Sequence, residues 1–337
     1  MRGYVANTDF DWFTYLRAIE PPIDEVNFWR PGSGTSFRAV QPGEPIFFKL
    51  KAPHNAIAGF GFFAHFSLLP VSMAWDVYQE ANGAPSFDQF RARLLRMRSR
   101  FEKGSDPRQD FWIGCILVHQ PVFFDDGDWV RMPSDYAVSI VQGKTYDLTA
   151  GEGERIWFEC LARAAKRPDW VGPYADLRQP LPIDRLPDQL ADRLVDRLIA
   201  VPIPSGYGPA QAIRPRLGQR SFRVAVLDSY GRRCAVTNEK TLPALEAAHI
   251  RAYRDVQEHT INNGILFRAD IHKLFDSGYV TVTPDHHFEV SRRIKEEFEN
   301  GRDYYKLNGT AIRLPRNPAH QPLAAALAWH NESRYLG

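Results

Sequence analysis

The sequence predicts an α+β protein with two domains joined by a helical and proline-rich connector. The chain has 337 residues, which is enough for two domains of ordinary size. Short apolar runs broken by Gly and Pro fill the first 150 residues, and nine prolines fall between Pro168 and Pro215. We therefore predict an N-terminal domain over 1–150, a connector over 151–216 and a C-terminal domain over 217–337.

The N-terminal domain is predicted to be a small β-barrel or strongly curved sheet with helices. Buried strands are expected in three apolar runs, PIFFKL (45–50), AIAGFGFFAHF (56–66) and FWIGCILVHQPVFF (111–124). Helices are expected at 11–19 and 86–101. In the second helix the apolar residues recur at helical spacing, which is typical of a helix that packs on a core; they are Phe87, Phe90, Leu94, Met97 and Phe101.

The connector is predicted to hold two helices, at 151–168 and 187–200. In the second, Leu190, Leu194 and Leu198 share one face. The prolines around these helices indicate irregular, extended chain.

The C-terminal domain is predicted to alternate short helices and strands. Helices are expected at 219–230, at 269–278 with Gly278 as the C-cap, and at 323–336. Short strands are expected at 232–237 (RRCAVT) and 245–250 (LEAAHI). Residues 279–291 alternate around Pro284 and Asp285, so they predict a hairpin.

Composition excludes several classes of protein. Hydrophobic residues make up 44% and charged residues 24%, as in ordinary globular proteins. No run of 18 apolar residues predicts a membrane span, and acids near the start argue against a signal peptide, so a cytoplasmic protein is expected. Cys115, Cys160 and Cys234 form no CxxC pair, which argues against a disulfide framework and a cysteine-rich zinc site.

The segment 245–276 concentrates polar residues that are suited to hydrolysis. His272 and Asp276 lie four residues apart on a predicted helix, so one face presents an imidazole and a carboxylate that can bind a divalent cation. His249 ends a predicted strand, where it could act as a general base. Asn263 lies in the sequence NNG, where its amide can tie the loop to backbone groups.

The order and spacing of these four residues resemble the HNH nuclease motif of the ββα-metal fold. The resemblance implies that His249 activates water, that Asn263 holds the loop and so the base, and that His272 binds the metal. Asp276 falls where some members carry a further ligand. From about Leu217 onward the chain is similar to the HNH modules of bacterial modification-dependent restriction enzymes.

The chain departs from this family in two places. Ala248 stands where many members have a metal ligand, so the cation, Mg²⁺ or Mn²⁺, would depend on His272 and Asp276. Glu246 is a weak candidate ligand, because residues three apart on a strand point to opposite faces. Cys234 is alone where some members have paired CxxC motifs, so no structural zinc is expected. Three basic residues near the motif are candidate DNA contacts: Arg251, Arg268 and Lys273.

The N-terminal domain resembles the PUA superfamily, which includes EVE, ASCH and SRA modules. The resemblance rests on three stretches, TDFDWFTYL, DEVNFWRPG and FFKLKAPHNAIAGFGFF. It implies a pocket that holds a modified base between aromatic rings. Four residues are candidates for that pocket: Trp12, Asn27, Trp29 and Trp112. Lys51 and His54 lie in a loop that could touch phosphate.

A base reader joined to a nuclease predicts a modification-dependent restriction endonuclease. Its partner would be double-stranded DNA with 5-methylcytosine or 5-hydroxymethylcytosine, and a homodimer would cut both strands. Two alternatives stay open: an HNH defence effector triggered by a nucleotide or a protein, and a nucleic-acid-binding protein whose nuclease site is inactive.

Overall fold

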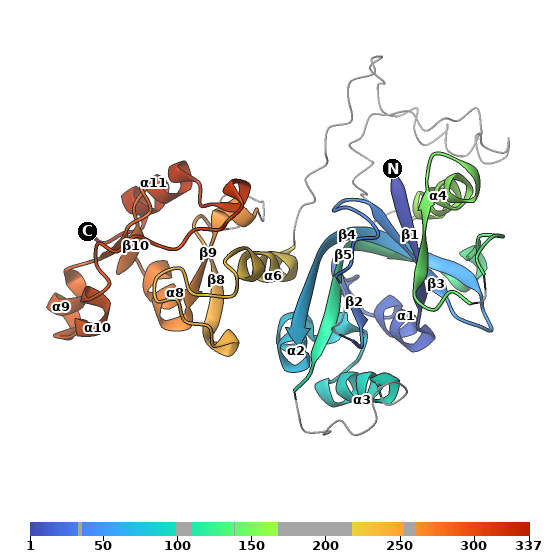
Figure 1. The fold of residues 1–337 in the computed structure, drawn as a ribbon, viewed down its shortest axis with the longest axis horizontal. Coiled ribbons are helices and arrows are strands. Elements are labelled where there is room, and N and C mark those ends of the chain that lie inside the picture. Colours follow the sequence, from blue (N-terminus) through green and yellow to red (C-terminus); the bar gives the residue numbers. More distant parts are fainter. Residues whose placement is uncertain (33–35, 99–109, 138, 168–217, 253–259) are drawn as a thin grey trace, which may run out of the picture. The chain divides into compact units, whose positions relative to one another are not determined.

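The computed structural model describes residues 1–32, 36–98, 110–137, 139–167, 218–252 and 260–337. The chain divides into two compact units, Met1–Pro215 and Arg216–Gly337 (Figure 1). The helix expected at 187–200 and most of the proline-rich connector lie outside the described residues. No described helix is both long and apolar enough to cross a membrane.

The first unit is built on a seven-stranded sheet. Its strands are β1 (Arg2–Thr8), β2 (Glu25–Arg30), β3 (Pro45–Leu50), β4 (Ala56–Pro70), β5 (Trp112–Phe123), β6 (Val130–Arg131) and β7 (Gly143–Asp147). The order is β2-β5-β4-β3-β1-β7, with β6 on β4. Only β1 and β3 are parallel among the described strand pairs.

Of the two forms that the sequence predicted, a small barrel or a strongly curved sheet, the described strands form an open, curved sheet. Among the described strands the sheet ends at β2 and β7, which do not pair with each other. β4 has two register shifts against β5, between Phe60 and Phe62 and between Phe63 and His65. Such bulges bend a strand and increase its twist, and β4 and β5 curve together along the sheet (Figure 1).

Helices cover both faces of this sheet. They are α1 (Phe10–Arg17), α2 (Val71–Tyr78), α3 (Phe87–Arg98) and α4 (Gly151–Ala164). Side chains alternate between the faces, so Ala6 of β1 packs in one core with α1, and Val5 packs in the other core with α4. The two helices thus bury opposite faces of one sheet.

Helix α4 is part of the first unit, although the sequence placed residues 151–164 in the connector. Its Trp157 is 5% exposed and packs edge-on against Phe47 and Phe60, with ring centroids 5.9 and 5.6 Å apart. A buried indole on a sheet face removes a large apolar area from water. Helix α4 is therefore a core element of this unit.

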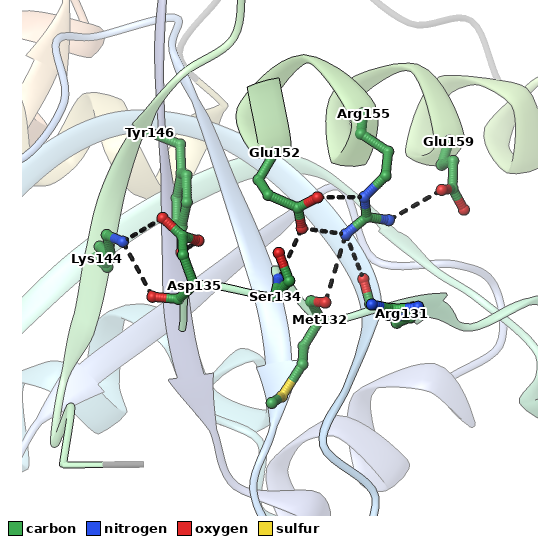
Figure 2. A network of polar contacts seen from close by, with 9 residues as sticks. All are labelled: Arg131, Met132, Ser134, Asp135, Lys144, Tyr146, Glu152, Arg155 and Glu159. Carbon is green, nitrogen blue, oxygen red and sulfur yellow. Dashed lines mark hydrogen bonds and ion pairs between the residues drawn. The ribbon is translucent and has the colours of Figure 1, made fainter. Parts of the chain in front are cut away.

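A polar network fastens the start of α4 to the segment before β7 (Figure 2). Arg155 bonds to Glu152 through Nε and Nη2, at 3.1 and 2.8 Å. The same Nη2 donates to the carbonyl oxygens of Arg131 and Met132, and the amide of Ser134 donates to Glu152 at 2.7 Å. One guanidinium and one carboxylate thus satisfy three backbone groups of this segment.

The second unit is built on a two-stranded hairpin followed by a helix. Its helices are α6 (Gln219–Ser229), α8 (Ala269–Asp276), α9 (Arg293–Phe298), α10 (Arg302–Tyr305) and α11 (Ala324–Ser333). Its strands are β8 (Leu245–His249), β9 (Gly264–Arg268), β10 (Val280–Val282) and β11 (Phe288–Val290). β8 and β9 pair antiparallel, with His249 opposite Gly264, and α8 follows directly. The predicted hairpin over 279–291 is confirmed as β10 and β11.

The strand expected at 232–237 is absent, and turns occupy this stretch instead. Arg232, and Asn238 just after the stretch, have φ values of +59° and +61°, in the left-handed region and outside the range of a regular strand. The amide of Cys234 donates to the carbonyl of Glu239 and so closes the turn.

The two units also contain short 3-10 helices, at Gln79–Asn82, Asp126–Asp128, Leu242–Ala244, Ile261–Asn263 and Pro318–His320.

Candidate active site

His249 is positioned by a close contact between α6 and the hairpin. Its ring stacks on Phe222 of α6, with centroids 3.9 Å apart and planes 14° apart. Gly264 faces His249 across the hairpin. A Cβ atom on Gly264 would lie 2.8 Å from the Phe222 ring and 2.5 Å from Val226. The absence of a side chain at Gly264 therefore lets α6 approach and hold the imidazole.

Asn263 fixes the chain that follows His249. Its Oδ1 accepts from the Arg251 amide at 3.0 Å, and its Nδ2 donates to the Arg251 carbonyl at 2.9 Å. The Asn263 carbonyl accepts from the Ile250 amide at 2.9 Å. Asn263 is 6% exposed, so these bonds are sheltered from water. One side chain thus satisfies both backbone groups of Arg251.

His272 is contacted by carboxylates at both ring nitrogens. Its Nε2 lies 3.3 Å from Asp276 Oδ2, four residues further along α8. Its Nδ1 lies 2.7 Å from Glu246 Oε2, which comes from β8. The Glu246 carboxylate at Nδ1 orients the ring so that Nε2 faces the Asp276 carboxylate. Imidazole and carboxylate donors therefore meet at one point.

The expectation that Glu246 points away from the site is wrong. Burial along β8 does not alternate, since Leu245 and Ala248 are buried while Glu246 and His249 are partly exposed. Among the described strands β8 pairs only with β9, so its other edge is open. A pocket that follows this edge can reach side chains from both faces of the strand.

Three of the four motif residues border one pocket of about 540 Å³. His249, His272, Asp276 and Glu246 all line it. Asn263 does not line the pocket; it holds the backbone of Arg251, two residues after His249. Helix α6, and α11 with the residue after it, supply further walls. Four residues there were not predicted as part of this site: Gln219, Arg223, Trp329 and Arg334.

The donors in this pocket fit a hard divalent cation that keeps much of its water. In the part of the chain that the structure describes, no group of three or more His, Cys, Asp or Glu side chains could hold a metal ion. His272 Nε2 and Asp276 supply two donors. Mg²⁺ is commonly bound by one or two carboxylates, with waters and substrate phosphates completing its octahedron.

The three candidate basic residues of this unit differ in their surroundings. Arg268 forms two bonds with Asp270, at 2.6 and 2.7 Å, and this guanidinium lowers the pKa of the Asp270 carboxyl. Lys273 is exposed on α8. The Arg251 guanidinium lies over the Trp329 ring, 5.1 Å from its centroid. Arg268 is thus occupied by an ion pair, whereas Arg251 stands beside the pocket.

Three of the four residues proposed for the base pocket meet around Asn82. Trp12 Nε1 donates to the Asn27 carbonyl at 3.2 Å, Asn27 Nδ2 to Asn82 Oδ1 at 2.9 Å, and Trp29 Nε1 to the Asn82 carbonyl at 2.8 Å. Trp12 is 3% exposed, and three phenylalanine rings pack on it. Trp112 lies apart, 40% exposed at the start of β5.

Lys51 and His54 lie in the exposed turn between β3 and β4. Lys51 Nζ is 3.4 Å from Asp9 Oδ2. The His54 ring stacks on Phe10, with centroids 4.4 Å apart, and Phe10 is itself 40% exposed. This turn, together with Phe10 of α1, therefore presents a lysine and two stacked rings to solvent.

Comparison with known proteins gives matches to part of the chain. Three solved structures, of ASCH from Zymomonas mobilis and of two mutants of the same protein, are 15%, 15% and 14% identical. Each match covers 46% of this chain and 94%, 96% and 94% of the other, with TM-scores of 0.29, 0.28 and 0.29. No curated protein matches. Residues 234–283 match the family model of the HNH endonucleases, and the second unit accordingly contains an HNH endonuclease domain.

Proposed function

We propose that this chain is a divalent-metal-dependent DNA endonuclease that cuts DNA carrying a modified base. The observation that carries the proposal is the convergence of His249, His272 and Asp276 on one pocket within the segment that matches the HNH family. A general base and a cation site that face the same cavity are the two parts that one-metal phosphodiester hydrolysis needs.

In this proposal His249 takes a proton from water as the water attacks phosphorus in line. Asn263 acts on this step indirectly, because it fixes the backbone next to His249. His272 and Asp276 would hold the cation, and Glu246 keeps the His272 ring oriented through Nδ1. A cation bound there would stabilise the negative charge that develops on the phosphate and on the leaving oxygen.

The base-reading role is assigned to the first unit. Asn27 Oδ1 is buried and has no hydrogen-bond partner among the described residues. A buried acceptor without a partner costs about 1–3 kcal/mol, and the exocyclic amine of a cytosine would satisfy it. Trp29 lies beside it through Asn82, and entry of a base requires Trp12 or Asn82 to move. Lys51 and His54 would contact the backbone of 5-methylcytosine- or 5-hydroxymethylcytosine-containing DNA.

The proposed active form is a homodimer in the cytoplasm. One site of this kind addresses one phosphodiester, and a two-fold axis supplies a second site for the antiparallel strand. Light scattering of the protein, alone and with a modified duplex, tests the assembly. A monomer in both conditions that still makes double-strand breaks at single sites would contradict the dimer.

Cleavage of matched plasmids tests the function. We expect Mg²⁺ or Mn²⁺ to support cutting of plasmid with modified cytosine, with little cutting of unmodified plasmid, and none by the His249→Ala variant. Equal cutting of both plasmids would contradict base reading by the first unit but would still support the proposed nuclease activity. Cutting that needs an added nucleotide or protein would favour a triggered effector, and no cutting under any condition would indicate an inactive site.

A further inference from the structure

Helix α11 forms a wall of the nuclease pocket, although it lies outside the HNH-matching segment 234–283. Its residues Trp329 and His330, and Arg334 just after it, line the same pocket as His249 and His272. Sequence periodicity alone suggested only an apolar helix here. Its contacts and its charges indicate a part in substrate binding.

Helix α11 is fastened to the catalytic segment at both ends. Before its first turn, the Leu323 amide donates to the Asn262 carbonyl at 3.1 Å. After its last turn, the Leu336 amide donates to the Gly278 carbonyl at 2.9 Å. A Cβ on Gly278 would lie 2.2 Å from the Arg334 carbonyl oxygen, so this approach requires glycine. The helix is thus held against both the Asn263 loop and the end of α8.

His330 fastens the middle of the helix. Its Nε2 bonds to the Phe275 carbonyl at 3.2 Å and its Nδ1 to the Thr281 hydroxyl at 2.8 Å. Its ring stacks on Phe275, with centroids 3.8 Å apart. Since Phe275 directly precedes Asp276, Trp329 and Arg334 are held in a fixed relation to the proposed cation site.

Two guanidinium groups converge on the Trp329 ring. The Cζ atoms of Arg251 and Arg334 lie 5.1 and 5.9 Å from the ring centroid. Cation–π contacts of this kind restrain the side chains but leave their N–H donors available. The backbone of Arg251 is itself held by Asn263. The two cations are therefore oriented before any ligand arrives.

Three arginines at or beside the pocket differ in charge pairing from three others in the same unit. Arg232, Arg268 and Arg293 pair with Asp228, Asp270 and Glu297. Among the described residues, Arg223, Arg251 and Arg334 have no carboxylate within ion-pair distance. Arg223 and Arg334 line the pocket, and Arg251 lies over the wall residue Trp329. Cations in such positions favour an anionic ligand.

We infer that Arg251 and Arg334, held by Trp329, bind the phosphates that flank the scissile phosphodiester, and that Arg223 of α6 contacts the same strand from another wall. The inference rests on the proposed nuclease function and names its strand-binding residues. Arginine suits this role because its planar fork can give two parallel hydrogen bonds to one phosphate. The HNH segment would supply the chemistry, and α11 would hold the strand in line with it.

Salt-dependent binding of DNA tests this assignment without any cleavage. The full chain with His249→Ala, in EDTA, is titrated against a fluorescent duplex with and without modified cytosine. Each phosphate contact contributes about 0.9 to the slope of log K against log salt. Arg334→Gln and Arg251→Gln should each lower that slope by about 0.9. When salt is raised from about 50 to 200 mM, the fold-loss of affinity should therefore be about 3.5 times smaller for each variant than for the parent.

Arg316→Gln is the matched control, because Arg316 is exposed in the same unit and does not line the pocket. Its slope should equal that of the parent. Trp329→Leu should weaken binding and leave the unfolding midpoint within the range of the arginine variants. Unchanged slopes for both Arg334→Gln and Arg251→Gln, or an equal drop for Arg316→Gln, would overturn the inference. A parent that binds neither duplex would instead overturn the proposed function.

Discussion

Replacement of Gly264 by alanine should disturb both the stability of the HNH domain and the position of His249. The added Cβ would lie 2.5 Å from Val226 Cγ2 and 2.8 Å from Phe222 Cζ, whereas carbon atoms pack at about 3.5–4.0 Å. Gly264 has φ −127° and ψ 143°, which alanine adopts freely, so the backbone itself is not strained. The destabilising part of the effect therefore comes from packing.

The expected loss of stability follows from two opposing contributions. Overpacking of a core by one methyl group costs about 1–3 kcal/mol. Alanine also reduces the conformational entropy of the unfolded chain, which returns about 0.4–1 kcal/mol. We expect Gly264→Ala to destabilise the second unit by about 1–2 kcal/mol, and its urea midpoint to fall accordingly.

Turnover should fall as well, because Phe222 must move and His249 is stacked on it. A displacement of about 1 Å at a reacting group can cost about 10²-fold in rate. Gly127→Ala is a suitable control, since an added Cβ there meets no atom within 4 Å. The double variant Gly264→Ala/Phe222→Leu should regain only part of the stability, because Val226 still meets the added Cβ. It should not regain activity, because the ring beneath His249 is gone.

The measurements are urea unfolding and plasmid cleavage under single-turnover conditions. Wild-type stability together with wild-type turnover in Gly264→Ala would show that α6 yields freely and does not position His249. Lower stability with unchanged turnover would separate the packing of α6 from the placement of the base.

Three further outcomes are expected. His249→Ala should lower the cleavage rate about 10²–10⁴-fold without weakening DNA binding, and turnover equal to wild type would remove His249 from the mechanism. His272→Ala should weaken Mn²⁺ binding, measured by calorimetry, more than Asp276→Ala does. The reason is that water can replace an exposed carboxylate more easily than an imidazole held in place. The reverse order of effects would count against His272 as the main ligand. Burial lowers the pKa of both His119 and His330 from 6.5 to about 4. The unfolded chain therefore takes up protons first, and each histidine should lower stability by about 3 kcal/mol as pH falls from 6.5 to 4, with none lost above 6.5. Unfolding midpoints that do not change between pH 6.5 and 4 would contradict this predicted loss of stability.

The motif residues were predictable because their spacing is local. His272 and Asp276 lie one helical turn apart on a helix that ends as expected, with Gly278 at φ +79° after it. Contacts between residues far apart in the sequence could not be predicted in this way. Glu246 contacts His272 across 26 residues, and the assumption of strict alternation along β8 wrongly placed Glu246 away from the site.

The same limit applies to the remaining elements. RRCAVT has strand-like composition, but the left-handed residues Gly231, Arg232 and Asn238 turn it. Residues 151–168 were predicted only as a helix of the connector, because the strands on which α4 packs are about 100 residues away in the chain. Trp329 and Arg334 carried no motif, and only the fold brings them beside His249.

The fastening of α11 has a consequence for synthesis of the protein. Translation produces His249, Asn263, His272 and Asp276 before it produces Leu323, His330 and Leu336, on which α11 depends for its hold on the site. A nascent chain at that stage carries the complete motif but lacks one wall of its pocket. Under the proposed function, such a chain would hold nucleic acid less tightly than the finished protein does.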